Sequence, residues 1–115
     1  MAVTDAGAKM VQRRVLGSEA DFGVTSKWAD DPGLEFRPLL GDRFGVVCRG
    51  DNPLAAHLAP LDTLAFRELA EPTLEREICV ITRRARVLSP AAESMLGMIA
   101  QQLRTYALPR GVRLV

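Results

Sequence analysis

The sequence is poor in the residue types that most often form catalytic or metal sites. It has one histidine, two cysteines, one tryptophan and one tyrosine among 115 residues. The cysteines lack C-x-x-C spacing and have no histidine nearby, which argues against a zinc site. His57 has no partner at a spacing that would orient it as a general base, so it is interpreted as a surface residue. We therefore expect a protein that is not an enzyme, with no catalytic residues, no metal site and no cofactor.

An excess of one charge and long apolar runs are also lacking. The formal net charge is +1, which argues against a dedicated nucleic-acid-binding domain, and no DNA-binding residues are expected. No apolar run approaches the length of a membrane span, and the N-terminus lacks the apolar core of a signal peptide. We therefore expect a cytoplasmic protein that does not bind membranes, with Cys48 and Cys79 as buried, reduced thiols.

The stretch 34–55 is the most informative part of the chain. Two apolar runs flank Gly41-Asp42-Arg43, and the second run leads to Pro53. Short apolar runs bounded by turn residues are typical of strands. Proline cannot donate to a sheet and moves the preceding residue out of helical geometry. The pattern therefore predicts a strand, a tight turn at 41–43, and a second strand that ends before Pro53.

The first helix is predicted within residues 4–17, where apolar residues recur at helical spacing. Thr4 or Asp5 is expected to cap its first turn with a side-chain oxygen. Gly17 is expected to end it in the left-handed conformation. A short buried strand is predicted next, at 20–25.

The last helix is predicted over residues 89–106. Ser89 suits the N-cap position and Pro90 suits the first helical turn. An apolar face along this segment predicts that it packs on a sheet. The tail at 112–115 is expected to be loose.

Between these segments, residues 56–72 are ambiguous. A helix that starts at Pro60 and runs to residue 71 fits the loose spacing of the apolar residues. Residues 74–82 are then the clearest strand, because they are rich in β-branched residues.

Polar residues follow the predicted strand at 20–25 directly. Thr25, Ser26 and Lys27 offer two hydroxyls and an ammonium group. In open α/β sheets, ligands bind outside the carboxyl ends of strands. These residues are therefore candidates for binding a carboxylate or another polar effector. A solvated strand end is an equally good interpretation, since position is the only argument for a site.

A basic cluster precedes the last helix. Arg83, Arg84 and Arg86 lie close to the exposed amides of Ala91 and Ala92 at the predicted helix start. An anion site is one interpretation. A solvated run of charge is the favoured one, because surface charges usually serve solubility.

Four segments, in order, resemble the effector-binding domain of LysR-type transcriptional regulators. The resemblance covers more than half of the chain. Asn52 occupies a position at which the family usually has histidine. The segments are VLGSEADFGVTS (15–26), LEFRPLLGDRFGVVCRGDNPLA (34–55), REICVITRR (76–84) and RVLSPAAESMLGMI (86–99).

The resemblance implies an α/β fold, a partial periplasmic-binding-protein-like (type 2) lobe with a small mixed sheet and two main packing helices. Relative to the family pattern, we expect a truncated domain without the helix-turn-helix and without most of the second lobe. Residues 1–55 would form the first-lobe part with its crossover strand, 56–75 a replacement loop or short helix, and 76–107 the returning strand and closing helix. The crossover strands would then be antiparallel neighbours, which would place Cys48 near Cys79.

The resemblance also implies a function. A small-molecule effector, for example a carboxylate, is the expected ligand, and regulation of transcription is the expected role. The alternative is an interaction protein that only associates with full-length relatives, without binding ligand or DNA itself. Association with itself or with full-length LysR-type relatives is expected in either case. Thr25, Ser26 and Lys27 remain the candidate effector-binding residues.

Overall fold

The computed structural model describes residues 3–57, 59–61, 64–68, 74–109 and 111–115. Its residues cluster into two compact units, Met1–Gly41 with Glu77–Val115, and Asp42–Arg76. The two units are described separately below. In chain order the elements are α1 (Ala8–Leu16), β1 (Phe22–Ser26), β2 (Leu34–Arg43), β3 (Gly45–Arg49), the 3-10 helix η1 (Pro53–His57), β4 (Ala59–Leu61), β5 (Leu64–Glu68), β6 (Glu75–Arg83), α2 (Pro90–Thr105) and β7 (Val112–Leu114).

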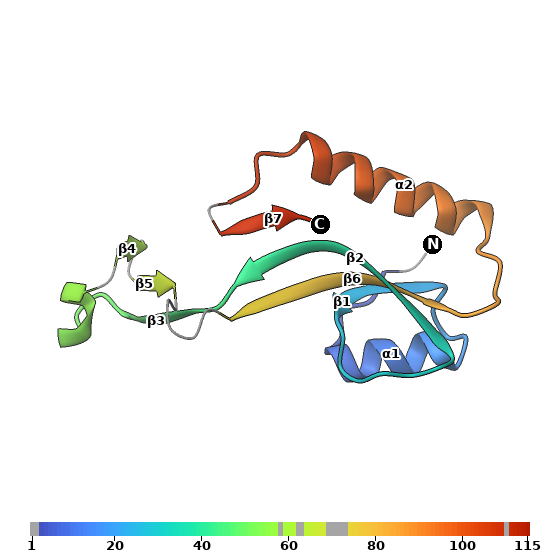
Figure 1. Ribbon diagram of the computed structural model, residues 1–115, viewed down its shortest axis with the longest axis horizontal. Helices are drawn as coiled ribbons and strands as arrows, with labels where there is room; N and C mark the ends of the chain where they lie inside the picture. Colours follow the sequence, from blue (N-terminus) through green and yellow to red (C-terminus); the bar gives the residue numbers. More distant parts are fainter. Residues whose placement is uncertain (1–2, 58, 62–63, 69–73, 110) are drawn as a thin grey trace. The chain divides into compact units, whose positions relative to one another are not determined.

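The first unit is a four-stranded sheet between two helices. Its strand order is β1-β6-β2-β7, and β1 pairs antiparallel with β6 from Phe22 opposite Thr82 to Ser26 opposite Ile78. The two helices α1 and α2 lie on opposite faces of this sheet (Figure 1). The predicted α/β class with two main packing helices is confirmed.

The hydrophobic core lies between α1 and the sheet. Alternation along β6 turns Cys79 and Ile81 towards α1, and the intervening Val80 towards α2. Val15 and Ile81 are fully buried. Four buried side chains form the cluster, namely Val15, Leu34, Cys79 and Ile81, with Val11, Ala20 and Phe36 partly buried against it.

The ends of α1 differ from the prediction. The helix begins after Gly7, and no side chain caps its first turn, so the predicted cap at Thr4 or Asp5 is wrong. Gly17 has φ −80°, an ordinary right-handed value, and Ser18 takes the left-handed conformation instead, with φ 61°. The reversal of the chain therefore occurs one residue later than predicted.

The start of α2 is as predicted. The Ser89 hydroxyl accepts a hydrogen bond from the backbone N–H of Ala92 at 3.2 Å, and Pro90 is the first helical residue. Ala92 and Leu96 are the buried residues of this helix. A serine cap satisfies one of the amides that the first helical turn leaves unpaired.

The C-terminal tail forms a strand, so the predicted loose tail is wrong. β7 lies beside β2, and the N–H of Val115 donates to the carbonyl of Leu39 at 3.0 Å. Arg113 of β7 lies close to Gly41 of β2, since a Cβ atom at Gly41 would be in ordinary van der Waals contact with its guanidinium at 3.4 Å. With β7 alongside, β2 continues through 41–43, where the sequence pattern predicts a turn.

The second unit is a three-stranded sheet. β5 lies between β3 and β4 and pairs antiparallel with both. The predicted helix that starts at Pro60 is therefore wrong for residues 60–61, which lie in β4, and for residues 64–68, which form β5, while its other positions lie outside the described residues. Ala65 of β5 is buried. Because β5 forms hydrogen bonds with a strand on each side, this segment adopts a strand rather than the helix that its apolar spacing also fits.

The two cysteines lie on different sheets. Cys48 of β3 is opposite Ala65, whereas Cys79 of β6 is opposite Thr25. The predicted antiparallel pairing of the two crossover strands, which would place Cys48 near Cys79, is therefore wrong, although β2 and β6 are neighbours. Both thiols are free, with Cys79 buried as predicted and Cys48 only partly buried.

Candidate functional site

Lys27 lies directly beyond the carboxyl end of β1. Its ammonium group is 4.8 Å from the ring centroid of Phe36 and forms an ion pair with the carboxylate of Asp30. A cation at this distance over an aromatic face is attracted by the electrons of the ring. The Lys27 side chain therefore has two partners that hold it near the start of β2.

The structure separates the two hydroxyls of the predicted site. A Cβ atom at Gly23 would lie 2.2 Å from Val11, so the side-chain direction at Gly23 is towards α1. Side chains alternate along a strand, so Thr25 shares that face and Ser26 has the opposite one. Both residues are partly buried, and Lys27 is exposed. The structure thus brings Lys27 to a hollow but does not place both hydroxyls on one face.

The hollow beside Lys27 has a volume of about 560 Å³. It lies between the β1–β2 loop and the start of β2. Two cations and three carboxylates contribute to its wall, so it suits a polar ligand better than an apolar one. The lining residues are Lys27, Asp30, Asp31, Pro32, Leu34, Glu35, Phe36 and Arg84.

Gln12 fixes the loop that forms this wall. Its side-chain oxygen accepts hydrogen bonds from the backbone N–H groups of Trp28 at 2.6 Å and Ala29 at 3.2 Å. Its amide nitrogen donates to the carbonyl of Ala29 at 3.0 Å. Gln12 is 7% exposed, so these bonds replace water on a buried side chain.

Sequence reasoning missed this role of Gln12. Gln12 and Val15 are three positions apart, however, and therefore share a helix face. Val15 is at the centre of the core, which makes a glutamine on that face a buried polar group that needs partners. The three-residue spacing between Gln12 and Val15 is therefore the sequence signal that could have indicated a buried glutamine.

The three arginines before α2 each have a partner in the chain. Arg84 donates to the carbonyls of Pro32 at 3.0 Å and Leu34 at 3.4 Å. Arg83 donates to the hydroxyl of Ser18. The sequence favours a solvated run of charge, whereas these two guanidinium groups bind a side chain and carbonyls of the chain itself.

The last of the three, Arg86, forms an ion pair with Asp21 at 3.2 Å. Together the three arginines tie the end of β6 and the segment after it to the loop between α1 and β1, to the β1–β2 loop and to the start of β2. Their positive charges are thus partly used within the protein.

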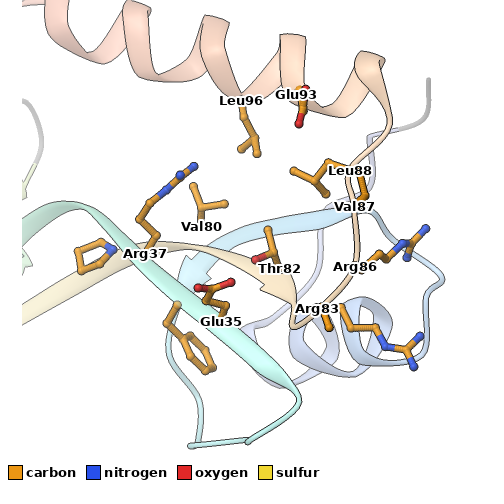
Figure 2. Close-up of a pocket in the computed structure, with 13 residues that line it drawn as sticks. Glu35, Arg37, Val80, Thr82, Arg83, Arg86, Val87, Leu88, Glu93 and Leu96 are labelled. Atoms are coloured by element: carbon orange, nitrogen blue, oxygen red, sulfur yellow. The ribbon is translucent and has the colours of Figure 1, made fainter.

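A second hollow, of about 470 Å³, lies between α2 and the sheet. Figure 2 shows Glu93 and Leu96 pointing from α2 towards the sheet, with Arg37 and Val80 pointing towards the helix. Its walls combine apolar side chains with charges of both signs. It also includes the segment that leads into α2, through Val87 and Leu88.

Within the described ranges, no group of three or more His, Cys, Asp and Glu side chains is arranged to hold a metal ion. The helices in those ranges are also too short or too polar to cross a membrane.

Comparisons with known proteins identify the family. Residues 1–65 match the model of the LysR substrate binding domain. The uncharacterized HTH-type transcriptional regulator YbhD of Escherichia coli (strain K12) is 32% identical over 53 residues, which are 46% of this chain and 17% of that regulator. The chain thus spans a small part of that relative.

A solved structure supports the same fold. The effector binding domain of QuiR, in complex with shikimate, has a TM-score of 0.74 and 12% sequence identity. The match covers 90% of this chain and 81% of that one. At this identity the likeness shows the fold alone. Because the family model matches more than half of the 115 residues, the chain belongs to the family of LysR substrate-binding domains.

Proposed function

We propose that this chain binds a small carboxylate effector and thereby takes part in the regulation of transcription. Family membership supports the role, and it supports a cytoplasmic location and binding rather than catalysis. The observation that carries the proposal is the position of Lys27, whose ammonium group lies over Phe36 at the wall of a polar hollow. This is the carboxyl end of a strand, where α/β folds bind ligands.

Charge explains why a carboxylate is the proposed ligand class. Lys27 is paired with Asp30, whose side chain is 91% exposed. Such an exposed ion pair contributes little stability, so an incoming carboxylate can replace Asp30 at low cost. The backbone of the loop meanwhile stays fixed by Gln12.

The carboxylates in the wall of the hollow limit the affinity for anionic ligands and determine which carboxylates fit. Asp31 and Glu35 add negative charge to the same hollow, and they repel a second carboxylate. Asp31 is itself held by the N–H of Gly33 at 2.8 Å. A monocarboxylate with hydroxyl groups therefore fits better than a dicarboxylate, since the hydroxyls can donate to Asp31 and Glu35.

Shikimate is a hydroxylated monocarboxylate and is the first probe to use. We expect it to shift the amide resonances of residues 25–36 in a two-dimensional NMR titration. Lys27→Met should abolish these shifts, and Thr25→Ala with Ser26→Ala should have a smaller effect, because these residues of β1 precede Lys27 and do not line the hollow themselves. Lys9→Ala is the matched control, because it removes the other lysine, which lies near Trp28 and does not line the hollow.

The titration tests the location of the site and the proposed function separately. Binding that Lys27→Met leaves unchanged would contradict the site. Failure of shikimate and of a panel of hydroxylated and plain monocarboxylates to bind the wild-type chain would contradict the proposed function.

A further inference from the structure

The hollow between α2 and the sheet continues along the helix. It has a volume of about 470 Å³ and adjoins another hollow of about 390 Å³, because five residues line both. Ligand sites usually measure about 300–1,000 Å³, so this joint space can hold a small molecule. Lys27 lines neither part, which distinguishes the space from the proposed effector site. The five shared residues are Arg37, Val80, Leu88, Glu93 and Leu96.

Two side chains of opposite charge point into the shared part from its two sides. Leu34 and Phe36 belong to the core next to α1, so alternation along β2 turns Arg37 towards α2. Figure 2 shows Arg37 pointing towards the helix and Glu93 pointing from the helix towards the sheet. Among the residues that the structure describes, neither side chain has a hydrogen-bond or ion-pair partner. Both charges are therefore available to a ligand.

Apolar side chains form the rest of the shared wall. Val80 of β6 is 2% exposed and Leu96 of α2 is 9% exposed. Gly97 lies four positions after Glu93 and therefore shares its helix face. A Cβ atom at Gly97 would meet nothing within 4 Å, so α2 leaves room there. With Leu39 and Ala100 in the same wall, the space has an apolar end along the helix.

We propose that this space binds an α-amino acid with an apolar side chain, such as leucine. The α-carboxylate pairs with the guanidinium of Arg37, which can donate two parallel hydrogen bonds to it. The α-ammonium group pairs with the carboxylate of Glu93. The apolar side chain packs against Val80 and Leu96 and extends into the room beside Gly97.

The charges in the wall disfavour simpler ligands. A wholly apolar ligand would remove water from Arg37 and Glu93 without replacing their hydrogen bonds, which costs free energy. A monocarboxylate would leave Glu93 unpaired, and Glu35 in the same wall would repel it as well. A monoamine would leave Arg37 unpaired. The two other arginines of this wall already bind Ser18 and Asp21, so an amino acid satisfies the charges that remain.

An NMR titration with L-leucine, in the absence of any other ligand, tests the site. Leucine should shift the amide resonances of residues 80–97. Isopentylamine lacks the carboxylate and isocaproate lacks the ammonium group, so each should bind there about tenfold more weakly. Equal affinity for leucine and either analogue would overturn the proposal. So would the absence of shifts in residues 80–97, including a result in which leucine shifts only residues 25–36 around Lys27.

Substitutions test the two charged groups. Arg37→Met and Glu93→Gln should each lower the affinity for leucine about tenfold, since each removes one charged partner. Arg104→Met and Glu19→Gln are the matched controls, because both residues are exposed and neither lines the space. Circular dichroism and thermal unfolding check that each variant is folded. Unchanged binding in the Arg37 or Glu93 variant, or an equal loss in the controls, would contradict the assignment.

Gly97→Leu tests where the ligand side chain lies. The wild-type chain should bind leucine more tightly than alanine, because leucine buries more apolar surface. Gly97→Leu fills the room beside α2 and should remove most of this preference, while the helix gains stability from the loss of glycine. A folded Gly97→Leu variant that keeps the full preference for leucine would overturn this placement.

Discussion

Arg76 and Asp42 join the two ends of the second unit through a two-point ion pair. The guanidinium donates Nε to Oδ1 at 3.1 Å and Nη2 to Oδ2 at 2.6 Å. This hydrogen bonding lowers the pKa of the Asp42 carboxyl below its ordinary value and raises that of Arg76. The pair lies where the chain enters and leaves the second unit.

The Asp42–Arg76 pair makes stability depend on pH. A carboxyl whose pKa is lower in the folded than in the unfolded state stabilises the fold above the unfolded pKa. This stabilisation is lost as the pH falls through the lowered folded value, below the ordinary 3.8. Asp42→Asn should therefore cost up to about 1 kcal/mol in the free energy of unfolding at neutral pH, and nothing near pH 2, by urea denaturation.

Asp51→Asn is the matched control for this prediction. It removes another ion pair of the second unit, between Asp51 and Arg49. The side chain of Arg49 is 80% exposed and that of Asp51 is 69% exposed. Solvent screens such a pair, so its removal should change little. An equal loss in both variants at both pH values would contradict the prediction.

Substitution of Gln12 should change amide hydrogen exchange locally, in the β1–β2 loop. Gln12→Ala leaves the backbone groups of Trp28 and Ala29 without their side-chain partner. Losing partners for buried polar groups costs about 1–3 kcal/mol. Amide hydrogen exchange at Trp28 and Ala29 should quicken more than in Gln101→Ala, which truncates an exposed glutamine of α2. Uniform acceleration across the first unit would indicate a general loss of stability instead.

A side chain at Gly23 should cause a steric clash between β1 and α1. A Cβ atom at Gly23 would lie 2.2 Å from Cγ1 of Val11, and valine has little rotamer freedom in a helix. Gly23→Ala should therefore destabilise the protein by about 1–3 kcal/mol. Adding Val11→Ala should recover part of this loss in a double-mutant cycle, because it removes the methyl group in question. Strictly additive losses would contradict the contact.

Gly97 provides the opposite case. It lies inside α2, and a Cβ atom there would meet nothing within 4 Å. Gly97→Ala should stabilise the protein by about 1 kcal/mol, since alanine is the better helix former. Thermal unfolding of the two alanine variants side by side should give shifts of opposite sign.

The cysteines should react at different rates. Burial raises the pKa of the Cys79 thiol, with a further contribution from Glu77, so less of the reactive thiolate is present. Cys48 is partly exposed on the second unit. Mass spectrometry after a short iodoacetamide treatment should find alkylation at Cys48 well before Cys79. Urea should remove the difference, and a difference that persists in urea would contradict burial as its cause.

Local signals in the sequence predicted the elements that local interactions determine. Ser89 and Pro90 specify the start of α2 through the first helical turn itself, and β-branched residues specify β6. The strand β5 was mistaken for helix because its loose apolar spacing fits a helix, while its pairing with two other strands is not visible in the residues. β7 was missed for the same reason, since its partner β2 lies some seventy residues earlier.

The candidate site was only partly predictable. Lys27 is a candidate from the sequence because it directly follows a predicted strand, and in the structure it lines a hollow. The partner of Lys27, Phe36, lies across a loop, and no spacing rule joins the two. Gln12 acts on the same loop from α1. Such contacts arise from tertiary packing, which a single sequence does not reveal.

The position of β6 between β1 and β2 has a consequence for the order of folding. β1 pairs with residues more than fifty positions later, so its register has high contact order and forms slowly. During synthesis, β6, the described partner of β1, is complete only when residues up to 83 have left the ribosome. The three-stranded sheet of the second unit, by contrast, is built from one continuous stretch. We therefore expect this sheet to form first, with the four-stranded sheet closing around β6 only when the chain is nearly complete.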